Sequence, residues 1–179
     1  TSLIITQGFI GATAENNTTT LGREGSDYTA AVFTNMLNAE SLSIWKDVDG
    51  LKNADPKLFE DTVNIAEINY REVIEMAYYG AQVIHPKTIK PLQNKKIPLY
   101  VKCFLNKDLP GTLIHEDADI RNLPPIIVLK QNQMLLTLGS RDFSFVTEDK
   151  LSDIYDIFHA LKIKINLMQN GAISFSCCI

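Results

Sequence analysis

Two patterns of apolar positions alternate along the first two-thirds of the chain. Short continuous apolar runs predict buried strands at 3–9, 42–45 and 97–104. Apolar residues near the helical spacing of 3.6 predict a helix that begins at an N-cap formed by Ser26 and Asp27. The same spacing predicts a second helix over 69–79, which ends at Gly80.

Strands that alternate with helices are typical of the α/β class. Such chains form a mainly parallel sheet with helices on both faces, and we expect that architecture for the first part of this sequence. Ligands of these sheets bind at the carboxyl ends of the strands. We therefore expect a site in the loops that follow Phe9 and Trp45.

The pattern changes near residue 122, where a polar stretch is followed by Pro124 and Pro125. We place a domain boundary there, so that the predicted domains are 1–122 and 123–179. Beyond it we expect a helix over 148–161 and strands at 126–129, 134–138, 163–167 and 173–177. Asn170-Gly171 predicts a hairpin between the last two strands, which indicates a small α+β domain.

Composition and charge exclude several classes of protein. The 179 residues are 45% hydrophobic and 21% charged, as in globular proteins, and the net charge of −4 argues against nucleic acid or an anionic membrane as partner. No apolar run reaches the roughly 18–20 residues of a membrane helix. Three cysteines, two of them adjacent, indicate free thiols in a reducing cytoplasm.

The two ends of the sequence suggest a piece of a longer protein. The chain does not begin with methionine and enters an apolar run almost at once. It closes directly after another strand-like run, at 173–178. Both ends lie in expected strands rather than in linkers.

The segment 18–27 carries the strongest chemical signal. Three threonines, two glycines and Arg23 lead into a predicted helix N-terminus, where free backbone N–H groups favour an anion. Arg23 has the geometry to bind a carboxylate or phosphate with two hydrogen bonds. Three roles are open for Asp27: a helix cap, a carboxylate beside a metal ion, or a partner that orients a lysine. The alternative is a surface loop before a well-capped helix.

A second candidate loop, at 46–57, follows the predicted strand 42–45. Asp49-Gly50 is by itself a turn signal, but its place after an apolar strand favours a ligand loop. Lys46 and Lys57 either serve nucleotide phosphates or are solvated. The three histidines have no Cys or His neighbours at metal-ligand spacing, so we propose no metal site formed by side chains.

Several motifs together resemble the aspartate kinases (aspartokinases) of the amino acid kinase family. They occur in the family's order over nearly the whole chain, at 7–11, 18–28 (TTTLGREGSDY), 44–50 (IWKDVDG), 54–56, 79–81, 85–86 and 111–112. The part after residue 130 resembles the start of the family's ACT regulatory region. The fold that this resemblance implies is a partial amino acid kinase domain followed by a partial α+β ACT-like domain.

The resemblance implies transfer of the ATP γ-phosphoryl group to the β-carboxylate of L-aspartate, with Mg²⁺. This reaction is the first step toward lysine, threonine and methionine. Arg23 and Asp27 would be catalytic, and Phe9, Gly22 and Arg23 would bind aspartate. The nucleotide-binding residues implied are Lys46, Asp47, Lys52, Lys57, Gln82 and Val83.

The resemblance further implies an amino-acid effector and a homodimer formed through the ACT region. Phe143, Ile165 and Asn166 would bind the effector. Asn166 occupies a position where lysine-inhibited relatives have an aspartate, so we expect lysine to act weakly. The family motif Lys-Phe-Gly-Gly-Thr-Ser does not occur in these residues. We therefore expect this chain alone not to phosphorylate aspartate.

Two alternatives remain at the level of sequence. One is a sibling kinase of the same fold that acts on acetylglutamate or carbamate. The other is a non-catalytic module for effector binding and dimerisation.

Overall fold

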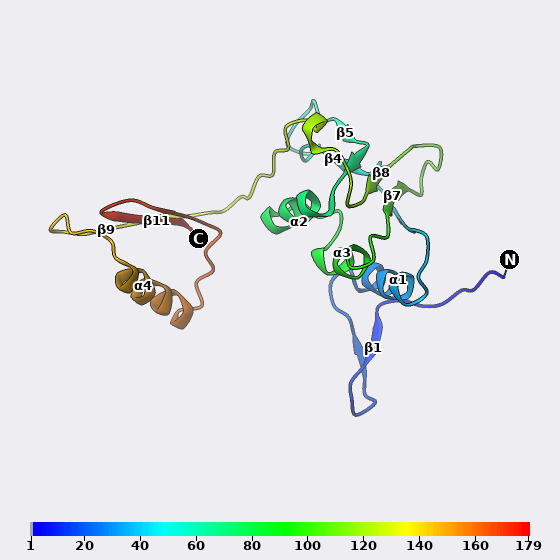
Figure 1. Cartoon of the computed structure of the whole chain (residues 1–179), viewed down its shortest axis with the longest axis horizontal. Helices are drawn as coiled ribbons and strands as arrows, with labels where there is room; N and C mark the ends of the chain where they lie inside the picture. The colour runs from blue at the N-terminus through cyan, green and yellow to red at the C-terminus, as the bar shows by residue number, and fades with distance from the viewer. Residues whose placement is uncertain (1) are drawn as a thin grey trace. The chain divides into compact units, whose positions relative to one another are not determined.

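A computed structural model describes residues 2–179, which form two compact units (Figure 1). The first unit ends at Leu129, and the second spans Lys130–Ile179. Residues 123–129 belong to the first unit because their backbone is bonded to it: the Ile127 N–H donates to the Asn53 carbonyl over 2.8 Å. The division therefore lies seven residues beyond position 122. None of the helices among residues 2–179 is long and apolar enough to cross a membrane.

A four-stranded sheet forms the centre of the first unit. Its order is β3 (Leu42–Lys46), β7 (Leu99–Cys103), β8 (Thr112–Ile114) and β6 (Glu67–Ile68). The β3–β7 and β6–β8 pairs are parallel, whereas β7 and β8 are antiparallel. The α/β class is confirmed, and the sheet is mixed.

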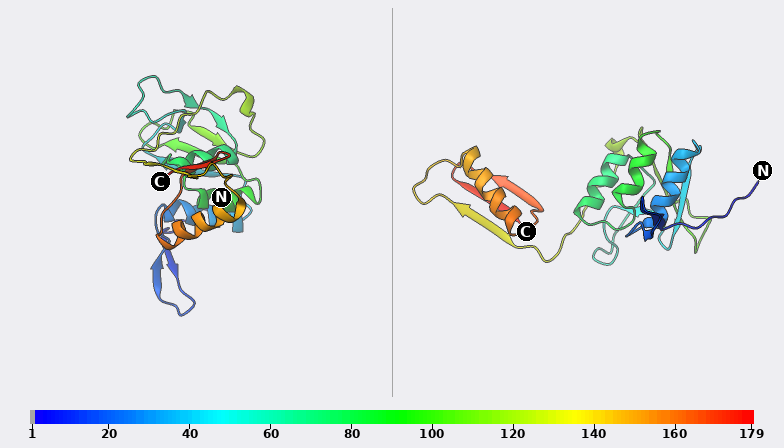
Figure 2. Two further views of the ribbon diagram at one scale, coloured as in Figure 1. Left: turned by 90° about the vertical axis from the view of Figure 1, so that its left-hand side faces the viewer. Right: turned by 90° about the horizontal axis from the view of Figure 1, so that it is seen from below.

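Three helices form a layer beside this sheet (Figure 2), namely α1 (Gly25–Met36), α2 (Tyr70–Tyr79) and α3 (Pro86–Gln93). Their buried residues, among them Ala31, Val73 and Ile89, join those of the strands in one hydrophobic core. Along β3, Leu42 and Ile44 are buried while Ser43 and Trp45 are exposed. Within the described part of the chain, the helical layer therefore covers one face of the sheet.

Short elements complete the first unit. Strands β1 (Ile10–Ala12) and β2 (Thr18–Thr20) pair as an antiparallel hairpin before α1. Strands β4 (Leu51–Lys52) and β5 (Asn64–Ile65) pair antiparallel after β3. A 3-10 helix, η1 (Ile120–Asn122), precedes the extended segment 123–129.

Two predictions for the start of the chain are wrong. No strand covers 3–9 within the described residues, and Leu3 and Ile5 are each 88% exposed. A strand needs a neighbour for its backbone groups, and residues 2–7 pair with none of the described strands. The N-cap of α1 is Glu24, in the left-handed region at φ 54°, so Ser26 and Asp27 lie in the first helical turn.

The second predicted helix and two predicted strands are confirmed. Helix α2 begins after Asn69, whose side chain accepts a hydrogen bond from the Glu72 N–H over 2.9 Å. It ends at Gly80, whose φ of 128° is strained for any residue with a Cβ. Strand β3 ends one residue beyond the predicted run 42–45. Strand β7 lies within the predicted run 97–104, beginning two residues after its start and ending one residue before its end.

The second unit has the predicted β-α-β-β order: β9 (Leu135–Gly139), α4 (Glu148–Ala160), β10 (Leu167–Asn170) and β11 (Ser174–Cys178). Its antiparallel sheet has the order β10-β11-β9, and the hairpin predicted at Asn170-Gly171 is present. Phe158 from α4 packs with Phe175 and Cys177 from β11 in the core of this unit.

Two predicted strands, the apolar run 126–129 and the alternating segment 163–167, do not form as predicted. Residues 126–129 are extended but pair with no strand described here, and they lie over α2 instead. Residues 163–166 precede β10, which begins only at Leu167. Short apolar or alternating segments indicate burial, but the tertiary fold decides whether a strand or a helix covers them.

Candidate functional site

The loop that joins β2 to α1 is closed by hydrogen bonds to Phe9. The Leu21 N–H donates to the Phe9 carbonyl over 2.8 Å, and the Phe9 N–H donates to Thr29 Oγ1 on α1 over 3.0 Å. Phe9 itself adopts a φ of 75°, which is uncommon for a bulky side chain. Such backbone strain is typical of ligand loops, and here it holds the hairpin against the start of α1.

Gly25 allows the close approach of this loop to the helix. A Cβ at position 25 would lie 2.9 Å from Leu21 Cβ and 2.9 Å from the Phe9 ring. Gly22 has a φ of 74°, so the turn before the helix also depends on glycine. The loop therefore presents its backbone at the N-terminus of α1, where the helix dipole favours an anion.

An ion pair joins the start of α1 to the carboxyl end of β3. Asp27 Oδ2 lies 2.9 Å from Lys46 Nζ, and the two side chains are only 17% and 20% exposed. The parallel pairing of β3 with β7 places Lys46 at the sheet edge where α/β proteins bind ligands. The pair links the two candidate loops predicted from the sequence.

Two further cations border the loop. Arg23 is exposed, and among residues 2–179 it has no hydrogen-bond or ion-pair partner. Lys87, in the first turn of α3, donates from Nζ to the Leu21 carbonyl over 3.0 Å. Lys87 is not among the residues predicted from the sequence, although its place directly after His85-Pro86, at a helix start, was a usable signal.

A cavity of about 460 Å³ opens beside the β3–β4 loop. Four of the predicted nucleotide-binding residues line it, namely Lys52, Lys57, Gln82 and Val83. Its remaining walls come from α2, from Gly80–Ile84 and from Ile127–Leu129, with Val73, Met76 and Ala77 contributed by the helix. Its volume lies in the range of small-molecule sites.

The walls of this cavity suit a ligand with an apolar ring and an anionic group. Leu51 and Ile84 are each 2% exposed and form apolar wall, while Lys52 and Lys57 place two positive charges at its border. At Gly80 a Cβ would meet nothing within 4 Å, so the backbone is open there. An aromatic base has room against the apolar wall with phosphates near the lysines.

Buried Thr112 fixes the loop that leads into the cavity. Its Oγ1 accepts a hydrogen bond from the Leu51 N–H over 2.7 Å and donates one to the Ile65 carbonyl over 2.6 Å. A Cβ at Gly50 would lie 2.5 Å from the same oxygen, so only glycine fits there. No local sequence pattern predicts this contact, because Thr112 is 61 residues from Leu51.

The remaining predicted residues lie outside the cavity. Lys46 is paired with Asp27, and Asp47 is exposed in the bend after β3. In the second unit, Phe143 is 77% exposed, whereas Ile165 packs against that unit's core. Asn166 accepts a hydrogen bond from Lys130 Nζ and donates one to Gln133. Residues 2–179 contain no group of three His, Cys, Asp or Glu side chains that could hold a metal ion.

The fold and the site define an α/β protein of the ligand-binding class. It has a cavity and, at the carboxyl ends of its parallel strands, a loop whose backbone N–H groups favour an anion. Residues 2–103, more than half of the chain, match the family model described as amino acid kinase family. The chain belongs to the amino acid kinase family.

Aspartokinases are similar to nearly the whole chain. Lysine-sensitive aspartokinase 3 of Escherichia coli is 37% identical over 172 residues, which are 96% of this chain and 38% of that protein. The crystal structure of E. coli aspartokinase III with aspartate and ADP has a TM-score of 0.76 at 36% identity and covers 99% of this chain. Its structure with lysine and aspartate has a TM-score of 0.78 and covers 98%. This chain spans 39% of each of those two chains.

Proposed function

We propose that this chain is part of an aspartate kinase, which transfers the γ-phosphoryl group of ATP to the β-carboxylate of L-aspartate. The observation that carries the proposal is its match, over 99% of its residues, to an aspartokinase structure that holds aspartate and ADP. The relatives are named aspartokinases, which favours this reaction over phosphorylation of acetylglutamate or carbamate.

In this proposal the loop 18–27 binds aspartate. Arg23 is exposed and free of partners among the described residues, so its guanidinium is available to a carboxylate. Phe9 and Gly22 shape the loop beside it. Asp27 fixes Lys46 through their ion pair and so places a cation beside the carboxylate that is phosphorylated.

The nucleotide occupies the cavity of about 460 Å³, with its base against the apolar wall. Lys52 and Lys57 neutralise the phosphates, and Gln82 and Val83 border the base. Because no described group of side chains suits a metal by itself, we propose that Mg²⁺ arrives bound to the phosphate oxygens. It would neutralise charge on the phosphoryl group during transfer.

The second unit is proposed to be an ACT-like regulatory domain through which two copies associate. Its strands β9 and β10 are the edges of the sheet and carry exposed apolar residues such as Leu135, Leu167 and Met168. Covering these residues by a second copy would remove apolar surface from water. An amino-acid effector would bind near Phe143, Ile165 and Asn166.

A cytoplasmic location completes the proposal. Cys103, Cys177 and Cys178 are all free thiols in the structure. Free thiols persist in a reducing compartment.

Calorimetric titration of the 179-residue chain tests the function. We expect ADP to bind, and aspartate to bind in its presence. Arg23→Ala should weaken aspartate binding about ten- to a hundredfold, as the loss of one charge-assisted contact does. Affinity for ADP should not change. The matched control is Arg71→Ala, an exposed arginine on α2.

If Arg23→Ala binds aspartate as tightly as Arg71→Ala does, the role of the loop is wrong. If the unchanged chain binds neither ligand, the alternative of a non-catalytic module is favoured.

A further inference from the structure

One wall of the nucleotide cavity is a segment without secondary structure of its own. Residues 123–129 run extended past α2, and Ile127–Leu129 line the cavity. The next residue, Lys130, begins the second unit. The position of this wall is therefore set by whatever holds the segment to the first unit.

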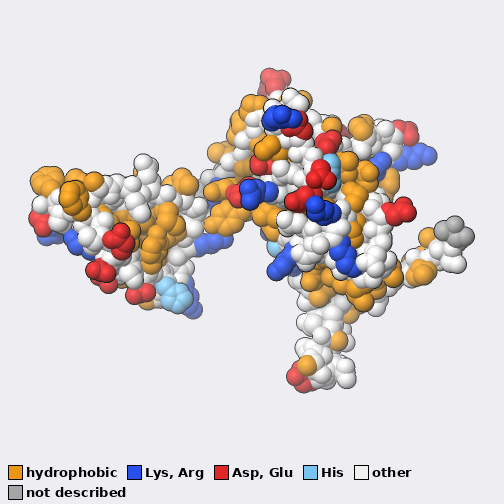
Figure 3. All heavy atoms as spheres, viewed as in Figure 1, with side chains coloured by type: hydrophobic (Ala, Val, Ile, Leu, Met, Phe, Trp, Pro, Cys, Tyr) orange, Lys and Arg blue, Asp and Glu red, His pale blue; other side chains and the backbone are white. Residues whose placement is uncertain are grey.

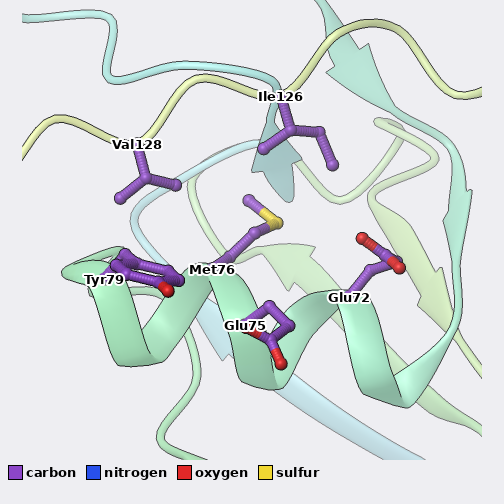
Figure 4. Close-up of a pocket in the computed structure, with 6 residues that line it drawn as sticks. All are labelled: Glu72, Glu75, Met76, Tyr79, Ile126 and Val128. Atoms are coloured by element: carbon purple, nitrogen blue, oxygen red, sulfur yellow. The ribbon is translucent and has the colours of Figure 1, made fainter. Parts of the chain in front are cut away.

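The apolar contacts of this segment would restrain it only weakly if they acted without hydrogen bonds. Ile126 and Val128 face Met76 and Tyr79 of α2 across a hollow of about 270 Å³ (Figure 4). Ile127 and Leu129, on the other side of the segment, are 47% and 55% exposed. Side chains that border a hollow lose part of their dispersion contacts, so they restrain the backbone weakly.

Asn53 supplies the polar contacts that fix this segment. Its carbonyl accepts from the Ile127 N–H over 2.8 Å, and its side-chain Nδ2 donates to the Pro125 carbonyl over 3.1 Å. The same residue exchanges two hydrogen bonds with Val63: its Oδ1 accepts from the Val63 N–H over 2.7 Å, and its own N–H donates to the Val63 carbonyl over 3.0 Å.

The neighbours of Asn53 in sequence also line this cavity, next to the segment that Asn53 holds. Lys52 and Ala54 both line it, whereas Asn53 does not. Asn53 thus joins the loop with the phosphate-neutralising lysine to the segment that closes the cavity. Because Asn53 does not line the cavity, its uncharged side chain acts on the ligand through the wall.

We propose that Asn53 is a positioning residue for nucleotide binding: it clamps 125–127 and so holds Ile127–Leu129 as the wall against which the base packs. This inference rests on the proposed function of the cavity. It assigns the start of the interdomain connection to the nucleotide site.

The variant Asn53→Asp removes the side-chain contact to Pro125 and keeps the side-chain contact to Val63. The carboxylate keeps the acceptor for the Val63 N–H but loses the donor to the Pro125 carbonyl. The matched control is Asn106→Asp, an exposed residue whose Oδ1 accepts from the Asp108 N–H and which does not line the cavity. Both variants add one negative charge to the first unit.

Two probes separate positioning from charge. ADP responds to both a displaced wall and a repulsive carboxylate, whereas adenosine has no phosphate and responds to the wall alone. In Asn53→Asp we expect both ligands to bind about tenfold more weakly, as after loss of one hydrogen bond. Asn106→Asp should bind both as the unchanged chain does. Loss of ADP affinity with unchanged adenosine affinity would overturn the positioning role, and so would unchanged affinity for both.

Hydrogen exchange tests the clamp without any ligand. In the free chain, the amide of Ile127 should exchange about tenfold faster in Asn53→Asp than in Asn106→Asp. Equal exchange in the two variants would show that Asn53 does not fix the segment. If the unchanged chain binds neither ADP nor adenosine, the proposed function fails together with this role. The exchange result then still shows whether the clamp exists.

Discussion

The two units of this chain differ most in the size of their cores. Sixteen buried residues form the core of the first unit, and three form that of the second. The second unit has only one helix over a three-stranded sheet within Lys130–Ile179, and domains of this size are marginally stable. The second unit therefore has less stability in reserve than the first.

Exposed apolar side chains occur on both units, above cores of different size. On the face of the first unit seen in Figure 3, acidic and basic side chains are interspersed. The first unit exposes Leu3 at 88% and the second exposes Phe143 at 77%, but in the second unit such side chains lie over a core of only three buried residues. A small core with much exposed apolar surface is typical of a domain that is completed by a partner. The proposed aspartate and nucleotide sites, in contrast, belong to the unit with the large core.

The largest effect should come from Phe175→Ala. Phe175 is fully buried between α4 and the sheet, and such a truncation costs about 3–5 kcal/mol. That is comparable to the whole stability of a unit of this size, so we expect the NMR signals of Lys130–Ile179 to collapse. Those of the first unit should persist, and ADP affinity should stay within threefold, roughly 0.6 kcal/mol.

Phe143→Ala is the matched control, because this phenylalanine is exposed and its removal should change stability by less than about 0.5 kcal/mol. If Phe175→Ala also unfolds the first unit, the two units are not independent and the comparison fails.

Thr112→Val tests the larger unit. Valine keeps the shape but leaves the Leu51 N–H and the Ile65 carbonyl without their partner, at a cost of about 2–4 kcal/mol. We expect a lower denaturation midpoint with the first unit still folded. Thr137→Val in β9 should be nearly neutral, because Thr137 is exposed and its hydroxyl bonds only to that of Ser176. Equal effects of the two substitutions would remove the distinction between the units.

Tyr70 makes the stability of the first unit depend on alkaline pH. Burial, with a smaller contribution from Glu116, raises the pKa of Tyr70 to about 12, and its hydroxyl donates to the Ile97 carbonyl over 2.6 Å. The unfolded chain loses this proton near pH 10, so the free energy of unfolding should fall as pH rises from about 10 to 12.

Tyr70→Phe should cost about 1 kcal/mol at neutral pH and remove that part of the pH dependence. Urea unfolding of both proteins at several pH values measures it. A parallel pH profile of the variant would contradict the assignment to Tyr70.

The smallest effect is expected from free lysine. Asn166 is already bonded to Lys130 and Gln133, and the Lys130 ammonium repels the amino group of a lysine ligand. We expect lysine to bind the second unit with a dissociation constant above about 1 mM. Titration followed by NMR checks this, with Lys130→Gln as the variant that should bind lysine more tightly. Micromolar binding would show that Asn166 lies in a working lysine site.

Sequence alone predicted the elements whose signals are local. Helical spacing and Gly80 predicted α2, and a short apolar run predicted β3. The run at 3–9 and the run at 126–129 failed because apolar composition does not say which surface covers a residue. For 126–129 that surface is α2, which lies about fifty residues earlier in the chain.

The candidate site, like the fold, could be predicted from the sequence only in part. Asp27 and Lys46 were identified separately, and the sequence offered a lysine partner for Asp27 without naming which lysine. The grouping of Lys52 with Gln82 around one cavity followed from family resemblance rather than from spacing. Asn53 carried no signal because its partners, at Pro125 and Ile127, are defined only by the folded backbone.

The uncovered face of the sheet gives the molecule an intrinsic optical reporter. Trp45 is the sole tryptophan of the chain, lies 48% exposed on that face, and has Lys102 Nζ 5.9 Å from its ring centroid. Its fluorescence therefore comes from one known place, directly beside Lys46. Covering this face would shift the emission to shorter wavelength and protect the indole from soluble quenchers, and neither change requires a label.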